Sequence, residues 1–183
     1  MTLATSNKGK AEEFKLLFAE AKIGLKVENI KTVEIQSDTL EEIAVNSCIH
    51  AYNIVKNMVF VEDAGLFIDA LNGFPGPYSS YVYRTIGVEG VLKLVEGKSR
   101  GAAFVSVIAL YHPGKGVRVF KGMCRGVIAQ HPRGFSGFGF DPIFIPEGVG
   151  KTFAEMREDE KNKLSHRGEA ARKLIEWLKN TGF

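Results

Sequence analysis

The stretch Ala102-Ala103-Phe104-Val105-Ser106-Val107-Ile108-Ala109-Leu110-Tyr111 decides the fold that we predict for this chain. It is followed by His112-Pro113-Gly114 and then by Gly116–Ala129, a second segment rich in valine, isoleucine and phenylalanine. β-Branched and aromatic residues favour strands, whereas proline followed by glycine favours a turn. The two segments therefore predict a long antiparallel hairpin, which argues against an all-parallel sheet.

Amphipathic helices are predicted on either side of this hairpin in the sequence. From Lys10 to Ile23, apolar residues recur with helical spacing until Gly24, which we expect to end the helix. Thr39-x-x-Glu42 is a capping-box pattern and predicts the start of a second helix. Helical spacing also predicts a helix over Val88–Val95 and a last one that begins near Ser165.

Two short apolar stretches complete the expected sheet. Thr2–Thr5 is typical of an edge strand, and Met58–Val61 is typical of a buried strand that ends at Glu62-Asp63. A tight turn is predicted over Gly73–Pro77. Because helices and strands alternate and the hairpin is antiparallel, we predict an α/β fold with a mixed central β-sheet flanked by helices.

The composition is that of one folded domain. The chain has 183 residues, which favours a single domain over 1–183. Lys and Arg exceed Asp and Glu by only 24 − 21 = 3, too few to indicate a nucleic-acid partner. The longest nearly apolar run, Ala102–Tyr111, is about half of the ~20 residues that a membrane-spanning helix needs. No leader pattern is present, and Cys48 and Cys124 lie in apolar stretches, so we expect a cytoplasmic protein with reduced cysteines.

The first polar cluster lies between the first strand and the first helix. Asn7 suits a helix N-cap, Gly9 lets the backbone approach a ligand, and the amides at a helix N-terminus attract anions. A cation in the first helical turn, such as Lys10, is unfavourable unless an anion compensates it. The cluster fits a phosphate cradle without the Walker spacing, although a solvated capped turn gives the same pattern. Its members are Thr5, Ser6, Asn7, Lys8, Gly9 and Lys10.

A pair of carboxylates, Glu62-Asp63, follows the predicted buried strand. Paired carboxylates either bind a hard cation through oxygen or supply a general base. A capping acid with a surface salt bridge is the alternative. Glu34, between Val33 and Ile35, is a third possible metal ligand, and its spacing fits a solvent-facing strand residue equally well.

Two further clusters occur near the C-terminus. The loop Phe138-Gly139-Phe140-Asp141-Pro142 carries rings that can stack on a base and an aspartate that can accept from a base edge, although an aromatic core loop is the alternative. Lys161 precedes Ser165-His166-Arg167, where Ser165 is a candidate N-cap. A lone histidine is more often structural, but Arg167 at a helix N-terminus requires a compensating anion or acceptor and is the best internal indication of a ligand.

These clusters include five motifs that occur in a fixed order along the chain. The motifs are Thr5-x-Asn7-x-x-Lys10, Glu62-Asp63-x-Gly65-Leu66, Phe74-Pro75-Gly76, Phe138-Gly139-Phe140-Asp141-Pro142 and Ser165-His166-Arg167. In this order and spacing the chain resembles the inosine triphosphate pyrophosphatase family, also called Ham1-like or non-canonical purine NTP pyrophosphatases. The resemblance covers the chain from Thr2 to Leu178. It implies cleavage of inosine and xanthosine triphosphates, and of their deoxy forms, to the monophosphate and pyrophosphate with Mg²⁺. It also implies an elongated α/β fold with a central cleft and a homodimer.

The resemblance also implies roles for the matching positions. Thr5 to Lys10 would hold the phosphates, Asp63 would be a metal ligand and the proton acceptor for water, and Glu34 would be a metal ligand. Ala64 stands where many members have serine, so its phosphate contact would come from the backbone. Which carboxylate is ligand and which is base stays open. The base pocket would be formed by Phe138, Gly139, Phe140, Asp141, Lys161, His166 and Arg167.

Two other functions fit the residues. A non-enzymatic nucleotide-binding or RNA-binding module would explain the aromatic–glycine loop and the pI of 8.8, but it leaves Glu62-Asp63 without a role. A pyrophosphatase for canonical or modified pyrimidine nucleotides would differ in the base pocket rather than in the phosphate site.

Overall fold

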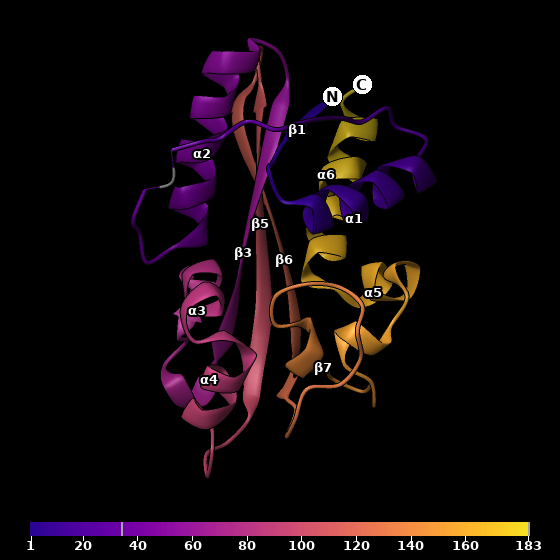
Figure 1. Ribbon diagram of the computed structural model, residues 1–183. Coiled ribbons are helices and arrows are strands. Elements are labelled where there is room, and N and C mark those ends of the chain that lie inside the picture. Colours follow the sequence, from indigo (N-terminus) through magenta and orange to yellow (C-terminus); the bar gives the residue numbers. More distant parts are fainter. Residues whose placement is uncertain (34, 183) are drawn as a thin grey trace.

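Three long antiparallel strands form the axis of an elongated molecule in the computed structural model, which describes residues 1–33 and 35–182 (Figure 1). They are β3 (Val59–Ile68), β5 (Gly101–His112) and β6 (Gly116–Ile128). β5 and β6 are the predicted hairpin, paired from Gly101 opposite Val127 to His112 opposite Gly116. The hairpin is long because apolar and β-branched residues continue along both of its strands.

Shorter strands widen the sheet at both ends of this axis. β1 (Thr2–Ala4) lies between β2 (Lys26–Glu28) and β3 and is parallel to both. β4 (Pro75–Gly76) pairs with β3, and β7 (Phe144–Pro146) pairs with β6, both antiparallel. Within the described residues the sheet therefore has seven strands and is mixed, as predicted.

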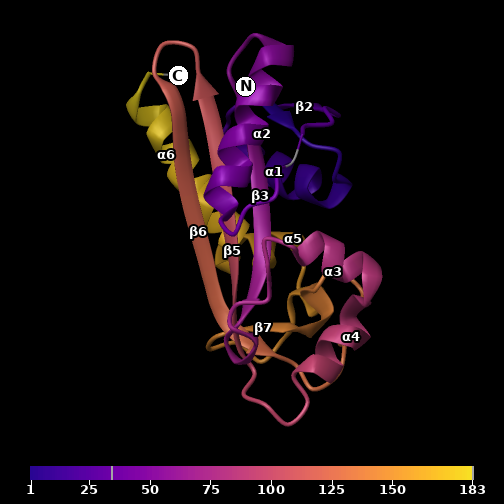
Figure 2. The same cartoon turned by 90° about the vertical axis from the view of Figure 1, so that its left-hand side faces the viewer.

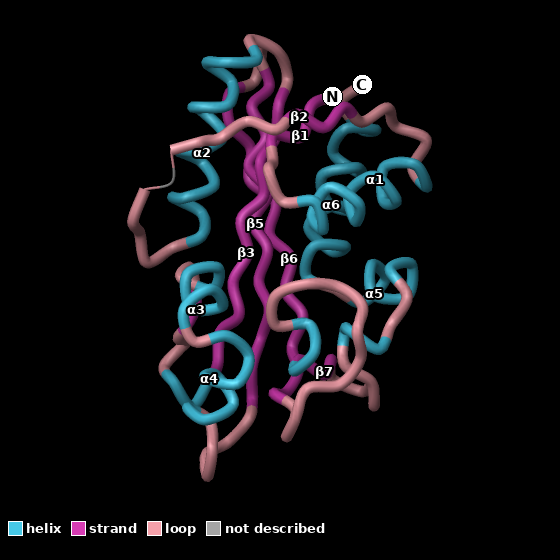
Figure 3. Tube along the Cα trace, viewed as in Figure 1, coloured by secondary structure: helices cyan, strands magenta, loops and turns pink. Residues whose placement is uncertain are grey.

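Helices cover both faces of the sheet, as the tube in Figure 3 shows. They are α1 (Lys8–Glu20), α2 (Leu40–Val55), α3 (Ser79–Thr85), α4 (Gly87–Leu94), α5 (Glu158–Leu164) and α6 (His166–Asn180). α2 lies on one face, and α1, α5 and α6 lie on the other (Figures 1 and 2). None of the helices in the described ranges is long and apolar enough to cross a bilayer.

Strand alternation assigns residues to the two faces. Phe60 and Ile108 pack with α1 and α6, whereas Val61 and Val107 pack with α2. At the other end of the sheet, Leu66 belongs to a third apolar cluster with residues of α3, α4 and β7. A polar side chain at an even-numbered position of β3 therefore points toward α1 and α6, and one at an odd-numbered position points toward the side of α2.

Several boundaries differ from the sequence prediction. β1 is not an edge strand, because β2 pairs with its outer side. α1 ends at Glu20 rather than near Gly24, since Lys22 already takes a left-handed conformation with φ 58°. α3, α5 and β7 were not predicted: the helices are short and the strand lies among glycines and prolines.

The largest correction concerns β3, which does not end at Glu62-Asp63 but continues to Ile68. The carboxylates lie in the middle of the strand, so they do not cap it. The two cysteines, in contrast, are buried and free, as predicted.

Candidate functional site

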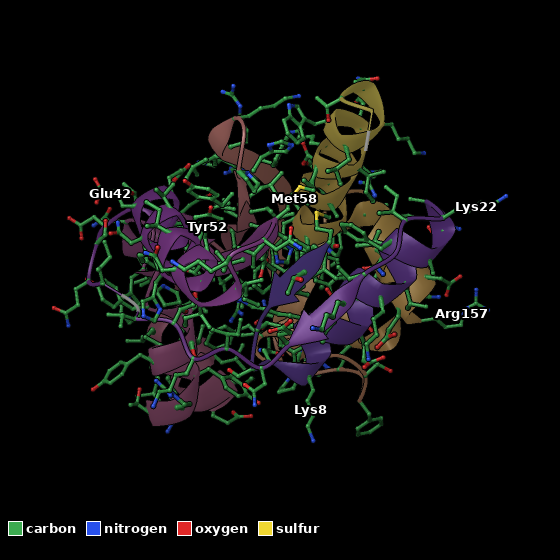
Figure 4. All side chains as sticks on the ribbon, turned by 90° about the horizontal axis from the view of Figure 1, so that it is seen from above. Lys8, Lys22, Glu42, Tyr52, Met58 and Arg157 are labelled. Atoms are coloured by element: carbon green, nitrogen blue, oxygen red, sulfur yellow. The ribbon has the colours of Figure 1, made fainter. Side chains whose placement is uncertain are left out.

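The turn between β1 and α1 has the local structure that the sequence predicts. Asn7 is the N-cap of α1, and its Oδ1 accepts a hydrogen bond of 3.0 Å from the backbone N–H of Lys10. Thr5 Oγ1 in turn accepts from the N–H of Asn7 at 3.2 Å. Ser6, Asn7 and Lys8 are exposed, and Lys8 projects into solvent (Figure 4). This turn therefore presents a helix N-terminus and a lysine to solvent, which is an arrangement that attracts anions.

Lys10 has an anionic partner within the chain. Its Nζ lies 2.9 Å from Glu62 Oε2 and also donates to the Glu62 backbone carbonyl at 2.9 Å. As predicted, the cation in this first turn is compensated by an anion. In this structure Glu62 supplies that charge, so the compensation by itself does not indicate a ligand, and the contact of Lys10 with phosphate stays a prediction.

Glu62 is the most fully enclosed carboxylate of the site. Its Oε1 accepts from Ser106 Oγ at 2.6 Å and from Arg167 Nε at 3.0 Å. Burial alone would raise the pKa of Glu62, but the charges of Arg167 and Lys10 outweigh it and lower the pKa to about 2. Glu62 is therefore ionised, and its low pKa together with the cations at both oxygens makes it a weak general base near neutral pH.

Asp63 points to the opposite face from Glu62, because successive residues of a strand alternate. It is half-buried, and its Oδ1 accepts from the N–H of Ala64 at 3.0 Å. Of the two neighbouring carboxylates, Asp63 is the one that solvent can reach. The structure thus separates a pair that the sequence treats as one feature.

Lys161 and Arg167 form a buried ion-pair cluster that joins α1, α5 and α6. Lys161 Nζ lies 2.7 Å from Glu13 Oε1 and 2.6 Å from Asp141 Oδ2. Arg167 Nη1 lies 2.6 Å from the second oxygen of Glu13. With Lys10 and Glu62, the cluster contains three cations and three carboxylates, so its charges balance. Sequence reasoning did not place Glu13 in the site.

Asp141 and Phe140 are less accessible than predicted. Asp141 is 3% exposed, accepts from the N–H of Phe138 at 2.8 Å and is paired with Lys161. Burial raises the pKa of Asp141 even though Lys161 opposes it. Phe140 is also 3% exposed and packs edge-on against Tyr83, with ring centroids 5.5 Å apart. In this structure Asp141 pairs with a lysine and Phe140 packs in the core, so their predicted contacts with a base stay predictions.

Phe138 is the ring that touches the site. It lies over the two buried cations, with its centroid 5.0 Å from Lys161 Nζ and 5.4 Å from Arg167 Cζ. A Cβ at Gly9 would collide with the same ring. Gly9 is therefore required by the approach of Phe138, whereas the sequence suggested the approach of a ligand. Gly139, next to Phe138, takes a left-handed φ of 62°.

Ser165 and His166 open α6. Ser165 is the N-cap, as predicted, and its Oγ accepts from the N–H of Gly168 at 3.0 Å. The His166 ring stacks on Phe104 at 4.6 Å between centroids. Burial, followed by the charge of Arg167, lowers the pKa of His166 well below its ordinary value, so the ring is neutral.

The start of α6 reaches the sheet because β6 has a glycine opposite it. A Cβ at Gly122 would collide with the backbone of His166 and Ala170. This close approach brings the Arg167 side chain within reach of Glu62 in the neighbouring part of the sheet. The unusual arginine at a helix N-terminus is thus compensated by carboxylates of the chain itself.

The donor chemistry suits a hard cation only in part. Within the described ranges, no group of three His, Cys, Asp or Glu side chains is arranged to hold a metal ion. Glu34, the second predicted ligand, lies outside the described residues. Asp63 is half-buried and carries carboxylate oxygens of the kind that Mg²⁺ prefers. Glu62 does not, because both of its oxygens already face cations.

Most of the predicted residues are brought together. Contacts link the first turn to the aromatic loop through Gly9 and Phe138, and to β3 through Lys10. Ala64 lies beside Asp63 and is half-buried. Sequence reasoning missed Ser106 and Glu13. A signal existed for each: Ser106 interrupts an apolar strand, and Glu13 shares a helix face with the buried Leu17.

In the described structure, the site residues named above line neither of two cavities. One of about 410 Å³ is bounded by β6, β7 and Glu147–Val149, and one of about 270 Å³ lies between α1, α5 and α6. The central cleft implied by the family resemblance therefore stays a prediction.

Comparison with known proteins gives a consistent result. Residues 1–177 match the model of the Ham1 family. A dITP/XTP pyrophosphatase of Hyperthermus butylicus is 54% identical, with 98% of this chain and 95% of the relative covered. One of Thermococcus kodakarensis is 50% identical, with 98% and 97% covered. The solved structure of a HAM1 protein from Coxiella burnetii superposes with a TM-score of 0.86 at 32% identity, and 98% of each chain is covered.

Fold and site together define a mixed α/β domain in which a helix N-terminus and a strand carboxylate adjoin a buried cluster of ion pairs. The chain belongs to the Ham1 family. The family that the five motifs suggested is confirmed, and the predicted activity is the one for which these relatives are named.

Proposed function

We propose that this protein hydrolyses dITP, ITP and XTP to the nucleoside monophosphate and pyrophosphate, which removes non-canonical purines from the nucleotide pool. The observation that carries the proposal is the convergence of the predicted motifs on one place. Lys10 from the first turn, Glu62 from β3, Phe138 from the aromatic loop and Arg167 from α6 are in contact. The names of the close relatives support the same activity.

The first turn is the proposed triphosphate site. The N-terminal amides of α1 carry partial positive charge, and Lys8 adds a mobile cation beside them. Thr5, Ser6 and Asn7 offer further polar groups at the same end of the helix. Lys10 contributes its charge while Glu62 holds its ammonium group in place. A polyanion docked here would be oriented with its reacting phosphate toward β3.

Asp63 is the proposed catalytic carboxylate. It is half-buried and lies on the face of the sheet opposite Glu62, whose side chain is fully enclosed and paired with Lys10 and Arg167. We propose that Asp63 and Glu34 hold Mg²⁺ and that Asp63 or a nearby carboxylate accepts the proton of the attacking water. Bound Mg²⁺ would offset the developing charge on the triphosphate.

Arg167 and Lys161 are the proposed selectors of the base. Both are donors only, so they suit the 6-oxo group of hypoxanthine and xanthine and not the 6-amino group of adenine. The ion pairs of Arg167 run through Nε and Nη1, and we propose that Nη2 meets the base. Phe138 lies over both cations and is the ring best placed to stack on that base.

A direct assay tests this function. Purified protein is incubated with ITP, dITP, XTP, ATP, GTP and dUTP in the presence of Mg²⁺, and both pyrophosphate and monophosphate are measured. We expect rapid release from the first three and slow release from ATP. Binding without release would indicate a nucleotide-binding module, and a preference for dUTP would indicate a pyrimidine enzyme.

Two further proposals follow from family membership. We propose that the protein is a cytoplasmic homodimer. Light scattering coupled to size-exclusion chromatography checks the dimer, since a mass near 40 kDa is expected for two chains of 20.1 kDa. A mass near that of one chain would contradict it.

A further inference from the structure

Glu62 connects the two ends of the proposed site. Its Oε2 lies 2.9 Å from Lys10 Nζ, at the phosphate end. Its Oε1 accepts from Arg167 Nε at 3.0 Å, at the base end. One carboxylate on a rigid strand thus sets the positions of two cations that come from different helices. Its own orientation therefore decides how well both ends are aligned.

Ser106 is a neutral residue that also contacts this carboxylate. Its Oγ donates to Glu62 Oε1 at 2.6 Å, and the side chain has no exposed surface. In the sheet Ser106 is paired with Ala64, so Glu62 is its diagonal neighbour on the same face. The short hydrogen bond to a charged group is of the strong kind.

A purely structural role does not explain why residue 106 is a serine. Its neighbours on this face of β5, Phe104 and Ile108, are both buried and apolar. A buried hydroxyl is tolerated only when it is hydrogen-bonded, so an apolar residue here would cost less. Without the hydroxyl, Oε1 would be held by Arg167 alone and Oε2 by Lys10 alone, so the carboxylate would be held less firmly.

We propose that Ser106 is a positioning residue for the hydrolysis: its hydroxyl orients Glu62, and Glu62 holds Lys10 at the phosphate end and Arg167 at the base end. The proposal rests on the function proposed above. It predicts that selection of ITP over ATP weakens when the hydroxyl is removed, although Ser106 itself has no exposed surface.

The first test measures Arg167 directly and needs no substrate. Hydrogen exchange of the Arg167 Nε–H is followed by NMR in wild type and in Ser106→Ala, with the signal assigned by its absence in Arg167→Lys. Loss of one hydrogen bond to a charged group corresponds to about a tenfold change in an equilibrium, so exchange should be about tenfold faster. Unchanged exchange overturns the proposal.

The second test measures selectivity. In Ser106→Ala, kcat/KM for ITP should fall about tenfold while kcat/KM for ATP changes less. The ratio of the ITP value to the ATP value should therefore decrease. Ser106→Cys keeps the shape with a weaker donor and should fall between the two, and it replaces the alanine variant if that does not fold. Faster exchange with an unchanged ITP to ATP ratio would mean that Ser106 only supports the structure, and this result also overturns the proposal.

Ser47→Ala is the matched control, because Ser47 is also buried but lies in α2, away from the ion pairs. It should change neither the exchange nor the ratio. If wild type releases no pyrophosphate from any nucleotide, the proposed function fails. The exchange measurement then still decides whether Ser106 fixes Arg167.

Discussion

The two ends of the proposed site differ in how they keep their charges. At the phosphate end, Ser6, Asn7 and Lys8 are exposed, and the helix N-terminus faces solvent. At the base end, Lys161 and Arg167 are each 2% exposed and are paired with carboxylates of the chain. The first end resembles an open anion site, whereas the cations of the second end are already paired with carboxylates of the chain.

Because of this difference, we expect one end to provide affinity for the triphosphate and the other to select the base. An exposed, solvated lysine attracts any polyphosphate and gives little discrimination. A side chain that can only donate, held in place by its carboxylate partners, can meet an acceptor such as a 6-oxo group but not a donor such as a 6-amino group. We therefore expect the phosphate end to bind nucleoside triphosphates in general and the base end to choose among them.

The largest effect is expected at Asp63, the carboxylate that both ends would serve. Asp63→Asn keeps the shape and loses the charge, so kcat should fall about 10²- to 10⁴-fold while the melting temperature stays near that of wild type. Steady-state release of pyrophosphate from ITP at saturating Mg²⁺ measures it. Asp38→Asn, an exposed control, should be unaffected. Near-normal turnover would remove Asp63 from the mechanism.

Arg167→Ala breaks the base end. It leaves Glu13 and Glu62 with fewer cations in a buried cluster, so the free energy of unfolding should fall by about 3–5 kcal/mol. The ITP to ATP ratio of kcat/KM should also fall, by about ten- to a hundredfold. Urea unfolding and paired kinetics measure the two effects. Arg125→Ala, in an exposed pair with Asp69, should change both little.

Low pH should weaken the ion pairs of Glu62 with Arg167 and Lys10. The pKa of Glu62 is lowered from 4.5 to about 2, chiefly because Arg167 and Lys10 outweigh the effect of burial. A depressed carboxyl pKa means that the stabilisation is complete above pH 4.5 and is lost as the pH falls toward 2. The loss in that window should be about 3 kcal/mol. Urea unfolding at a series of pH values measures it, and a flat profile below pH 4.5 would contradict the shift.

Gly9→Ala tests the contact between the two ends. The added methyl would collide with the Phe138 ring, which has to move away from Lys161 and Arg167. We expect a loss of about 1–3 kcal/mol in the free energy of unfolding and a higher KM for ITP. Gly24→Ala is the matched control, because a Cβ there meets nothing. Equal effects of the two substitutions would show that the contact with Phe138 does not matter.

Lys8→Ala should have the smallest effect. Because Lys8 is exposed, its attraction for phosphate is screened by salt and amounts to about 0.3–1 kcal/mol. KM should therefore rise about two- to fivefold for ITP and ATP alike, and less at high ionic strength. Lys179→Ala, exposed at the far end of α6, is the control. A change in the ITP to ATP ratio would mean that Lys8 senses the base.

Local structure was largely predictable from sequence. The Asn7 and Ser165 caps and the β5–β6 hairpin depend on interactions between residues close in the chain, so their patterns are visible there. The sequence predicts too short a strand for β3, because two carboxylates interrupt an apolar run. The strand continues because a partner 105 positions away neutralises Glu62, which no local pattern can show.

The sequence predicts which side chains form the candidate site, but it does not predict which residues they pair with. Lys10 and Arg167 were both noted as cations that need compensation at a helix N-terminus. Their compensation comes from Glu62 and Glu13, and local spacing gives no means to distinguish this from a bound anion. Glu13 itself is hidden in a helix pattern in which a glutamate next to apolar residues is ordinary.

The family, the mixed α/β class, the helix caps and most of the side chains that meet at the site can be predicted from the amino-acid order alone. The opposite faces of Glu62 and Asp63, the hydrogen bond from Ser106 to Glu62 and the ion pairs of the base end become visible only in the folded chain. The physical reason is that a cap or a strand pairs residues near one another in the chain. A buried charge, in contrast, is stable only through partners that folding brings from distant segments.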